Sequence, residues 1–372
     1  MQNKLKLVDK SMISIIHISL RHSADDLRIF HKECMTLSKN GFDVYYMVPT
    51  NKINPNAEVK ILPLKDHGTE IKNVTKNYVS ALRNSFKINA NVYHLHDPDL
   101  IPIGILLKII RKKIIYDAHE DHPKNVLKRG KNKILIASLF YIFEKLASYF
   151  FDHIIVATPE IGKKYPQKKT SLLMNVPILS LIDSIPSRDI HKEKYIMIYP
   201  GWITEDKGVV ELLSALNTFD NKIELWLFGQ IGKKLNQDLI KIQNNPNVKY
   251  FGIVEPEELY AYMKNADVGI ITLHPKEAYI TSLPVKTFEY MACSLPVIMS
   301  DFPYWKSLFK QCALFVDPQN PNDISNKLEE LISDKSLSKK LGQNGRRLVE
   351  KTYNWETESK KLIKIYDKLL KK

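Results

Sequence analysis

Short runs rich in β-branched and aromatic residues alternate along the chain with longer segments of helical period, and this alternation occurs twice. Such a pattern is typical of a parallel sheet with helices on both faces. The first series predicts strands at residues 13–18, 44–48, 59–62, 92–96, 113–116 and 153–157, with helices at 25–40, 74–86, 100–111 and 134–151. The second predicts strands at 195–199, 223–228, 248–251, 268–272, 296–299 and 313–316, with helices at 208–216, 235–243, 256–265, 286–293, 322–334, 336–351 and 355–371. We therefore predict the α/β class, with two doubly wound, Rossmann-like units in tandem.

The boundary between the two units is predicted where the alternation stops. The stretch before residue 195 contains prolines and mixed charges and has little periodicity, as linkers do. A chain of 372 residues is also longer than one compact domain usually is. We predict a first domain over 1–180, a linker over 181–194, a second domain over 195–352, and a C-terminal helix over 353–372.

The net charge indicates which classes of partner the protein could bind, and the cysteine content indicates its cellular compartment. The formal net charge of +14 favours anionic partners such as nucleic acid, acidic lipid headgroups or phosphorylated substrates. The basic residues are scattered and no nucleic-acid-binding module is recognisable, so nucleic acid is the least favoured of these. The three cysteines, Cys34, Cys293 and Cys312, are far apart and suit a reducing compartment. No secretory signal is recognisable, and we expect a cytoplasmic protein.

Two clusters of histidine and carboxylate follow predicted strands in the first half. His94, His96 and Asp97 lie at the end of one strand, and His119 follows the next strand. His94 and His96 share one face of a strand and could bind a metal; the alternative, a core histidine and a helix cap from Asp97, is also open. We favour a polar cluster facing a cleft over a metal site. An imidazole there could exchange a proton with a substrate hydroxyl, whereas the alternative for His119 alone is a polar turn.

In the second half, two strand-to-helix turns could hold an anion. One turn contains Gly201, Trp202 and Lys207 and leads into a predicted helix, whose free amides and lysine charge favour a diphosphate. It is neither a P-loop nor a G-x-G-x-x-G turn, and an ordinary turn is the alternative. Gly229 follows another strand and would let a flat ligand approach the backbone.

The segment 281–298 is a loop, a helix and a strand, and it is the most informative stretch of the chain. Ser282 and the amides after it could bind phosphate at the start of the helix. Glu289 lies inside the helix, where its carboxylate could accept two hydrogen bonds from a ribose diol. A solvated helix position is the alternative for Glu289, but the flanking Phe288 and Tyr290 indicate a half-buried helix.

These segments together resemble the retaining glycosyltransferases of the GT-B fold, family GT4. That family carries G-R-x4-K-G, a G-x-G-like turn, and E-x7-E running into E-Y-M-A-x-G-x-P-V-I in its second domain. Residues 201–208, 228–230 and 288–298 stand in those places here. In the first half, residues 26–33, 94–97 and 116–120 look like one branch of the family.

The resemblance implies two Rossmann-like domains facing each other across a cleft, and a C-terminal helix that packs back on the first domain. It implies a hexosyl or related transferase that moves a sugar from a nucleoside diphosphate sugar, with retention, to a saccharide or polyprenyl-linked acceptor. Surface polysaccharides such as O-antigen or capsule are the products we expect. No metal ligand set is recognisable in the second half, so we expect stabilisation of the diphosphate without a metal and without any other cofactor.

The resemblance implies a role for each residue that stands at a motif position of the family. Lys207 would contact the diphosphate, Glu289 would hold the ribose, and Ser282 and Leu283 would offer amides to phosphate. The remaining residues expected on the donor side are Gly201, Trp202, Gly229, Thr281 and Lys286. His119 would lie by the donor sugar at the reaction centre, with Asp97 nearby; these two are the predicted catalytic residues.

Two positions depart from the family pattern. Trp202 stands where the family has arginine, and Thr281 stands at the first glutamate of E-x7-E. Lys286 could supply the missing cation. Two alternatives stay open: a sugar-nucleotide 2-epimerase of the same fold, and a non-catalytic nucleotide-sugar-binding partner.

A basic stretch precedes the apolar helix predicted at 134–151. Its charges are Lys124, Lys128, Arg129, Lys131 and Lys133. A basic rim beside an apolar helix could rest on an anionic membrane at the inner face of the plasma membrane. A buried core helix with a solvated loop before it is an equal alternative.

Overall fold

A computed structural model describes residues 10–51, 58–64, 71–128, 133–219, 221–232, 235 and 244–371. The chain divides into two compact units: Met1–Asn175 with Glu358–Lys372, and Val176–Thr357. The predicted helix at 235–243 lies almost wholly outside the described residues, as do residues 129–132 of the basic stretch.

The N-terminal unit contains a seven-stranded sheet in the order β3-β2-β1-β4-β5-β6-β7, in which the paired strands run parallel. Its strands are β1 (Ser14–Ile18), β2 (Asp43–Pro49), β3 (Lys60–Leu64), β4 (Val92–Leu95), β5 (Lys113–Ala118), β6 (His153–Val156) and β7 (Thr170–Leu172). Six of these were predicted. The sequence pattern missed β7 because it has three residues, all half-buried, and so leaves no apolar run.

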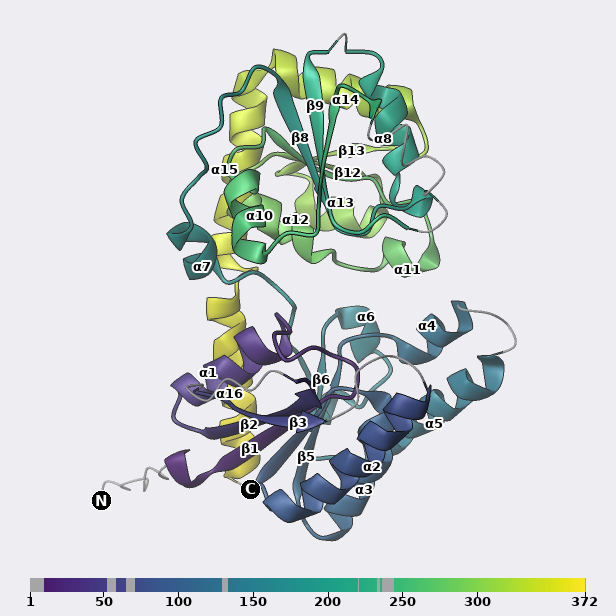
Figure 1. Ribbon diagram of the computed structural model, residues 1–372, viewed down its shortest axis with the longest axis vertical. Helices are drawn as coiled ribbons and strands as arrows, with labels where there is room; N and C mark the ends of the chain where they lie inside the picture. The colour runs from purple at the N-terminus through teal and green to yellow at the C-terminus, as the bar shows by residue number, and fades with distance from the viewer. Residues whose placement is uncertain are drawn as a thin grey trace. The chain divides into compact units, whose positions relative to one another are not determined.

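Helices cover both faces of this sheet. Figure 1 shows α2, α3 and α5 along one face and α1 and α16 on the other. The described helices of the unit that are longer than three residues are η2 (Ile29–Cys34), α1 (Met35–Lys39), α2 (Ile71–Ile88), α3 (Ile101–Ile109), α4 (His122–Lys128), α5 (Ile134–Phe150), α6 (Pro159–Gly162) and most of α16 (Trp355–Leu370). The helix predicted at 25–40 begins later, with a π-helical segment, because Asp26 Oδ1 accepts the amides of Arg28 and Ile29 and forms a turn there.

The two faces of the sheet differ in chemistry. Ile16 and Ile18 of β1 point into the apolar core with Tyr93 and Leu95 of β4. Successive side chains of a strand point to opposite faces, so His17 points the other way, where it is paired in register with His94. The sheet therefore has an apolar face and, opposite it, a face that carries buried histidines.

The C-terminal unit contains a six-stranded sheet in the order β10-β9-β8-β11-β12-β13, again with parallel pairs. Its strands are β8 (Tyr195–Pro200), β9 (Ile223–Phe228), β10 (Val248–Gly252), β11 (Val268–Ile271), β12 (Val297–Ser300) and β13 (Ala313–Val316). Strand β8 lies between β9 and β11, which is the point where the strand order reverses direction. Ligands of open α/β sheets bind at the carboxyl ends of strands beside such a point.

The described helices of this unit are α7 (Leu179–Ser184), α8 (Val209–Leu216), α10 (Pro256–Met263), α11 (Glu277–Ile280), α12 (Val285–Ala292), α13 (Pro303–Phe309), α14 (Pro321–Ser333) and α15 (Lys335–Lys351). Helices α8 and α14 pack together, as do α12 and α15. The helix α13 was not predicted, because its seven residues are too few to show a clear helical period.

The linker differs from the prediction of 181–194. The C-terminal unit begins at Val176, and α7 occupies the first part of the predicted linker. Arg346 Nη1 and Nη2 of α15 donate to Asp183 Oδ1 and Oδ2 at 2.8 and 2.9 Å, which holds α7 against its own unit. The chain returns to the N-terminal unit within α16, where the buried Tyr366 lies 2.9 Å from His94 Nδ1.

Candidate functional site

The carboxyl ends of β8, β9 and β10 are held close together by backbone hydrogen bonds. The Gly201 amide donates to Phe228 O at 2.8 Å, and the Gly229 amide donates to Gly252 O at 2.6 Å. Gly201 and Gly229 have φ values of +120° and +115°, a region that other residues rarely adopt. A Cβ at Gly229 would also collide with the Gly201 carbonyl. The packing of these strand ends therefore requires glycine at position 229. This requirement explains the glycine without a bound ligand.

Two lysines meet at this edge. Lys207 ends the short helix η6 (Glu205–Lys207), and Lys286 lies in the first turn of α12. Lys286 Nζ donates to Pro200 O and lies 5.1 Å from the centre of the Tyr199 ring. Burial and, after it, the charge of Lys207 lower the pKa of Lys286 to about 8. Burial likewise lowers the pKa of Lys207. A bound anion would relieve this repulsion, so the pair favours a phosphorylated ligand.

Glu289 lies one helical turn after Lys286, on the same face of α12. Its side chain is half-buried, and Oε1 accepts a 3.0 Å hydrogen bond from the hydroxyl of Tyr260 on α10. Its charge also acts to raise the pKa of Lys286. Glu289 is therefore not a solvated helix position but a positioned carboxylate beside the two lysines.

The loop before α12 corrects one prediction. Both the amide and the hydroxyl of Ser282 donate to Tyr279 O, at 3.1 and 3.0 Å. The indole of Trp305 donates to Ser282 O at 2.6 Å and fixes the loop further. The Ser282 amide is therefore already used and is not available to phosphate in this structure. The neighbouring Leu283 is half-buried, and its role remains a prediction.

The start of α12 can still bind an anion. Within the described part of the chain, no side chain caps this helix, and helix starts carry unpaired amides and a partial positive charge. Thr281 is exposed and has no carboxylate to offer. Trp202 has 55% of its surface exposed beside Gly201, so its ring is open to a ligand.

The sequence did not single out Asp206, although it orders this edge of the unit. Its Oδ2 accepts hydrogen bonds from Lys276 Nζ at 2.9 Å and from the Tyr279 hydroxyl at 2.8 Å. These bonds join the turn that carries Lys207 to α11. An aspartate before a lysine in a turn is too common a pattern to predict this role.

In the N-terminal unit the two polar clusters do meet, since β4 and β5 are neighbours. His96 Nδ1 lies 3.4 Å from Asp117 Oδ2, and His119 Nδ1 lies 3.6 Å from the same oxygen. Burial opposes a charged His119 ring, but the Asp117 carboxylate outweighs it and raises the pKa of His119. Arg28 Nε and Nη2 donate to Asp117 at 3.0 and 3.1 Å, which holds that carboxylate in place.

Asp97, the second predicted catalytic residue, lies inside the N-terminal unit. Its side chain is fully buried, and Oδ2 accepts bonds from the Leu20 amide at 2.6 Å and the Ser19 hydroxyl at 2.9 Å. Burial acts to raise the pKa of Asp97, but the nearby His22 and, after it, these two hydrogen bonds outweigh burial and lower it. Through Oδ2, Asp97 holds the loop that follows β1, and its predicted catalytic role stays a prediction. His94 and His96 are also fully buried, so the cluster does not open to solvent as predicted.

His22 belongs with His119, although the sequence did not indicate it. The centres of the two rings lie 5.0 Å apart, and His22 Nδ1 lies 2.8 Å from the Ser19 hydroxyl. Both rings keep some exposed surface, at 25% and 11% of their side chains. These two imidazoles therefore form a partly exposed pair in this cluster. The sequence did not indicate His22, because a lone histidine in a polar turn is a common pattern.

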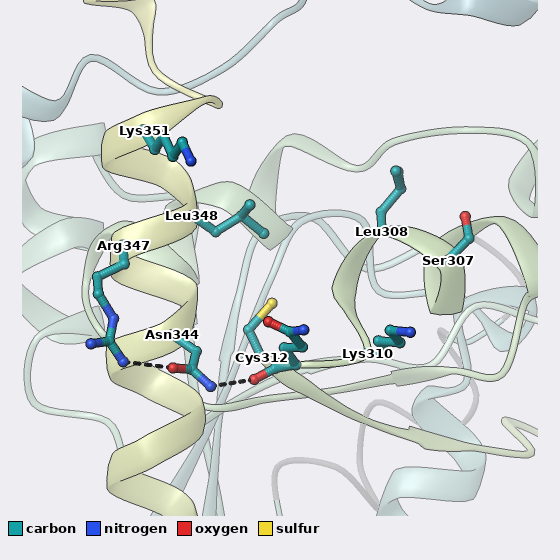
Figure 2. A pocket seen from close by; sticks show the side chains of 9 residues that line it. Ser307, Leu308, Lys310, Cys312, Asn344, Arg347, Leu348 and Lys351 are labelled. Atoms are coloured by element: carbon teal, nitrogen blue, oxygen red, sulfur yellow. Dashed lines mark hydrogen bonds between the residues drawn. The ribbon is translucent and has the colours of Figure 1, made fainter.

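A surface pocket elsewhere in the C-terminal unit lies away from this site. It has a volume of about 390 Å³ and is formed between α15 and the turn before β13 (Figure 2). Arg347 donates to Asn344, and Asn344 in turn donates to Gln311 O, both at 2.7 Å. Because β13 starts just after this turn, the pocket lies at the amino end of the strand, opposite the edge where ligands of such sheets bind.

One known family is similar to most of the C-terminal unit. Residues 183–348 match the family model of glycosyl transferases group 1. This range contains the lysine pair, Glu289 and the strand ends described above. The match covers most of the C-terminal unit, and the C-terminal unit is similar to that family over this range.

Two relatives are similar in sequence. An uncharacterized glycosyltransferase of Methanocaldococcus jannaschii is 23% identical over 303 residues, 78% of this chain and 81% of its own. The capsular polysaccharide biosynthesis glycosyltransferase CapM of Staphylococcus aureus is 24% identical over 187 residues, 48% of this chain and 47% of its own.

Solved structures agree on the fold. Sucrose-phosphate synthase from Thermosynechococcus elongatus superimposes with a TM-score of 0.76 at 18% identity, covering 96% of this chain and 99% of its own. HepE of Anabaena, solved in complex with UDP-glucose, gives a TM-score of 0.72 at 12% identity, covering 96% and 100%. The predicted fold class is confirmed: two parallel α/β units of the GT-B type.

Proposed function

We propose that the protein is a glycosyltransferase that uses a nucleoside diphosphate sugar as donor and transfers the sugar with retention. The observation that carries the proposal is the convergence of Lys207, Lys286 and Glu289 at the carboxyl ends of the strands beside the switch point. Lysine charge and helix amides suit the departing diphosphate, and a positioned carboxylate suits a ribose diol. The matched family and the UDP-glucose complex of HepE support the same ligand class.

The roles divide between the two units. The C-terminal unit binds the donor through Lys207, Lys286, Glu289 and the start of α12. In the N-terminal unit His119 acts at the reaction centre, held by Asp117, with His22 beside it. Fixed positive charge supplies the stabilisation of the leaving group, so the transfer proceeds without a metal at the donor site.

The experiment that tests the proposal has two stages. Thermal-shift measurements against UDP, GDP and their sugars identify the donor, since a ligand at a hundred times its Kd adds about 2.7 kcal/mol of stability. Turnover of that donor is then measured with and without saccharide acceptors. Transfer needs an acceptor, whereas a 2-epimerase converts the donor alone and a non-catalytic binder converts nothing.

We further propose that the acceptor belongs to surface-polysaccharide assembly and is lipid-linked. CapM is a capsule enzyme, and it is the relative that supports this choice. Helix α5 supports membrane proximity, because it exposes eight large apolar side chains. They are Ile134, Leu135, Ile136, Leu139, Tyr141, Ile142, Tyr149 and Phe150.

We propose that this apolar surface of α5 rests on the membrane surface. Among the helices within the described ranges, none has the length and apolarity that a membrane span needs. Co-sedimentation with vesicles of phosphatidylglycerol and phosphatidylcholine tests the contact. We expect binding at low salt that Leu135→Glu and Tyr149→Glu weaken together; wild-type protein that stays in the supernatant contradicts the proposal.

A further inference from the structure

Four fully buried side chains converge on the histidine-bearing face of the N-terminal sheet. His17 lies in β1, His94 in β4, His96 directly after β4, and Glu33 in η2. Each offers one ligand atom, and these atoms lie within 4.8 Å of one another. We propose that these four side chains bind one divalent transition-metal ion, with Zn²⁺ as the best fit.

The distances suit a tetrahedral ion. His17 Nδ1 lies 2.9 Å from His96 Nε2, and Glu33 Oε2 lies 3.9 Å from both His17 Nδ1 and His94 Nδ1. Zinc–nitrogen bonds of about 2.0 Å in a tetrahedron place neighbouring ligand atoms about 3.3 Å apart. The observed separations bracket that value, so small side-chain movements complete the site. Three imidazoles and one carboxylate form a ligand set that zinc accepts.

The hydrogen bonds within the cluster do not satisfy Glu33. Among the residues that the structure describes, none donates a hydrogen bond to either of its carboxylate oxygens, although both are buried. Arg28 Nε approaches Oε1 to 3.1 Å as an ion pair, which leaves Oε2 directed at the imidazoles. A buried carboxylate without hydrogen bonds is costly. A cation bound to Oε2 removes that cost.

Groups outside the cluster orient the imidazoles in the way that metal sites require. Ligating histidines commonly direct their second nitrogen at a carboxylate or another polar group. The second nitrogen of His96 faces Asp117 Oδ2 at 3.4 Å, and that of His17 faces the Tyr366 hydroxyl at 3.4 Å. Tyr366 also lies 2.9 Å from His94 Nδ1, and metal binding replaces that contact.

A second group, His96, Asp117 and His119, shares one residue with the first. Asp117 is engaged by Arg28 through two hydrogen bonds, so its oxygens are less available to a metal. The first group has four ligands and no accessible position for a reactant. The ion therefore joins β1, β4 and η2 and stabilises the unit, and it takes no part in the transfer.

Metal content of the full chain, produced without a histidine tag, tests the proposal. The protein is treated with a chelator, incubated with Zn²⁺, desalted and analysed by mass spectrometry of the elements. We expect about one zinc per chain and a higher melting temperature with Zn²⁺ than after chelation. Co²⁺ in place of Zn²⁺ gives the visible absorption of a four-coordinate site. Wild-type protein that retains no zinc overturns the proposal, whatever the variants do.

Variants of single histidine and glutamate residues test which side chains bind the zinc ion. Glu33→Gln and His17→Gln are expected to weaken zinc binding at least tenfold, whereas His191→Gln, at an exposed position in the other unit, leaves it unchanged. His119→Gln also leaves it unchanged, because His119 belongs only to the second group. Loss of zinc in His119→Gln with retention in Glu33→Gln and His17→Gln overturns the proposal, as does retention in all variants.

Discussion

The Tyr260 hydroxyl donates a 3.0 Å hydrogen bond to Glu289 Oε1 and so fastens α10 to the helix that carries Lys286. If Glu289 holds the ribose, this bond sets the direction of its carboxylate. Tyr260→Phe is then expected to weaken UDP binding about fivefold, the equivalent of one hydrogen bond at roughly 1 kcal/mol. Glu289→Ala removes the carboxylate and is expected to weaken binding at least tenfold. Isothermal titration calorimetry measures both changes.

Tyr262→Phe is the matched control for this prediction. Tyr262 lies on the same helix, and its ring packs against the stacked rings of Phe228 and Phe251. We expect its variant to bind UDP as the wild type does. Equal affinity of Glu289→Ala and wild type would remove Glu289 from the donor site.

The lowered pKa of Lys286 predicts a pH dependence of donor binding. With a pKa of about 8, Lys286 is charged below that pH and loses its proton above it. Binding of a diphosphate requires the charged form, so affinity for UDP is expected to be level below pH 8. Above pH 8 it falls by up to tenfold per pH unit. Calorimetry between pH 6.5 and 9.5 measures this profile.

Lys286→Arg serves as the control, because arginine stays charged throughout this range. Its profile is expected to stay flat apart from any titration of the ligand itself, which the two proteins share. A wild-type affinity that rises with pH would contradict the assignment of Lys286 to the diphosphate.

The ion pair between Arg28 and Asp117 is predicted to stabilise the N-terminal unit strongly. Both side chains are almost wholly buried, at 6% and 0% exposure, and the contact is bidentate. Arg28→Met leaves a buried carboxylate unpaired and is expected to lower the free energy of unfolding by about 3–5 kcal/mol. Urea unfolding followed by circular dichroism measures the loss.

An exposed ion pair provides the comparison. Arg188 and Glu258 are about 40% exposed, and Arg188→Met is expected to change stability by about 1 kcal/mol or less. Losses of equal size in the two variants would show that the buried pair has no special role.

His119 is predicted to act in transfer and not in donor binding. His119→Asn is expected to lower the rate of transfer about 10²- to 10⁴-fold, the usual contribution of a proton-exchanging group. UDP binding should stay within twofold of the wild type, because the predicted donor contacts lie in the other unit. Product formation and calorimetry are measured on the same preparation, and unchanged turnover would exclude the role.

Local patterns predicted most of the secondary structure because both periods, two for strands and near 3.6 for helices, are visible in short windows. The strands of the C-terminal unit lie within two residues of their predicted bounds. The strand β7 and the helices α4, α6, α7, α11 and α13 were not predicted, because each has seven residues or fewer. The sequence also did not predict that the Ser282 amide donates a hydrogen bond to Tyr279 O, because this bond forms in a turn, and turns have no periodic sequence pattern.

The residue types and the order of the strand and helix patterns along the chain determined the α/β class and the two units. They also determined which polar side chains follow each strand. Only the tertiary structure decided which groups act together. The order β3-β2-β1-β4 sets His17 beside His94, 77 positions apart in the sequence, and the order around β8 brings Lys207 to Lys286. The packing of the crossover helices determines which strands are neighbours in a parallel sheet. A local sequence pattern does not contain this information, because it depends on contacts between distant segments.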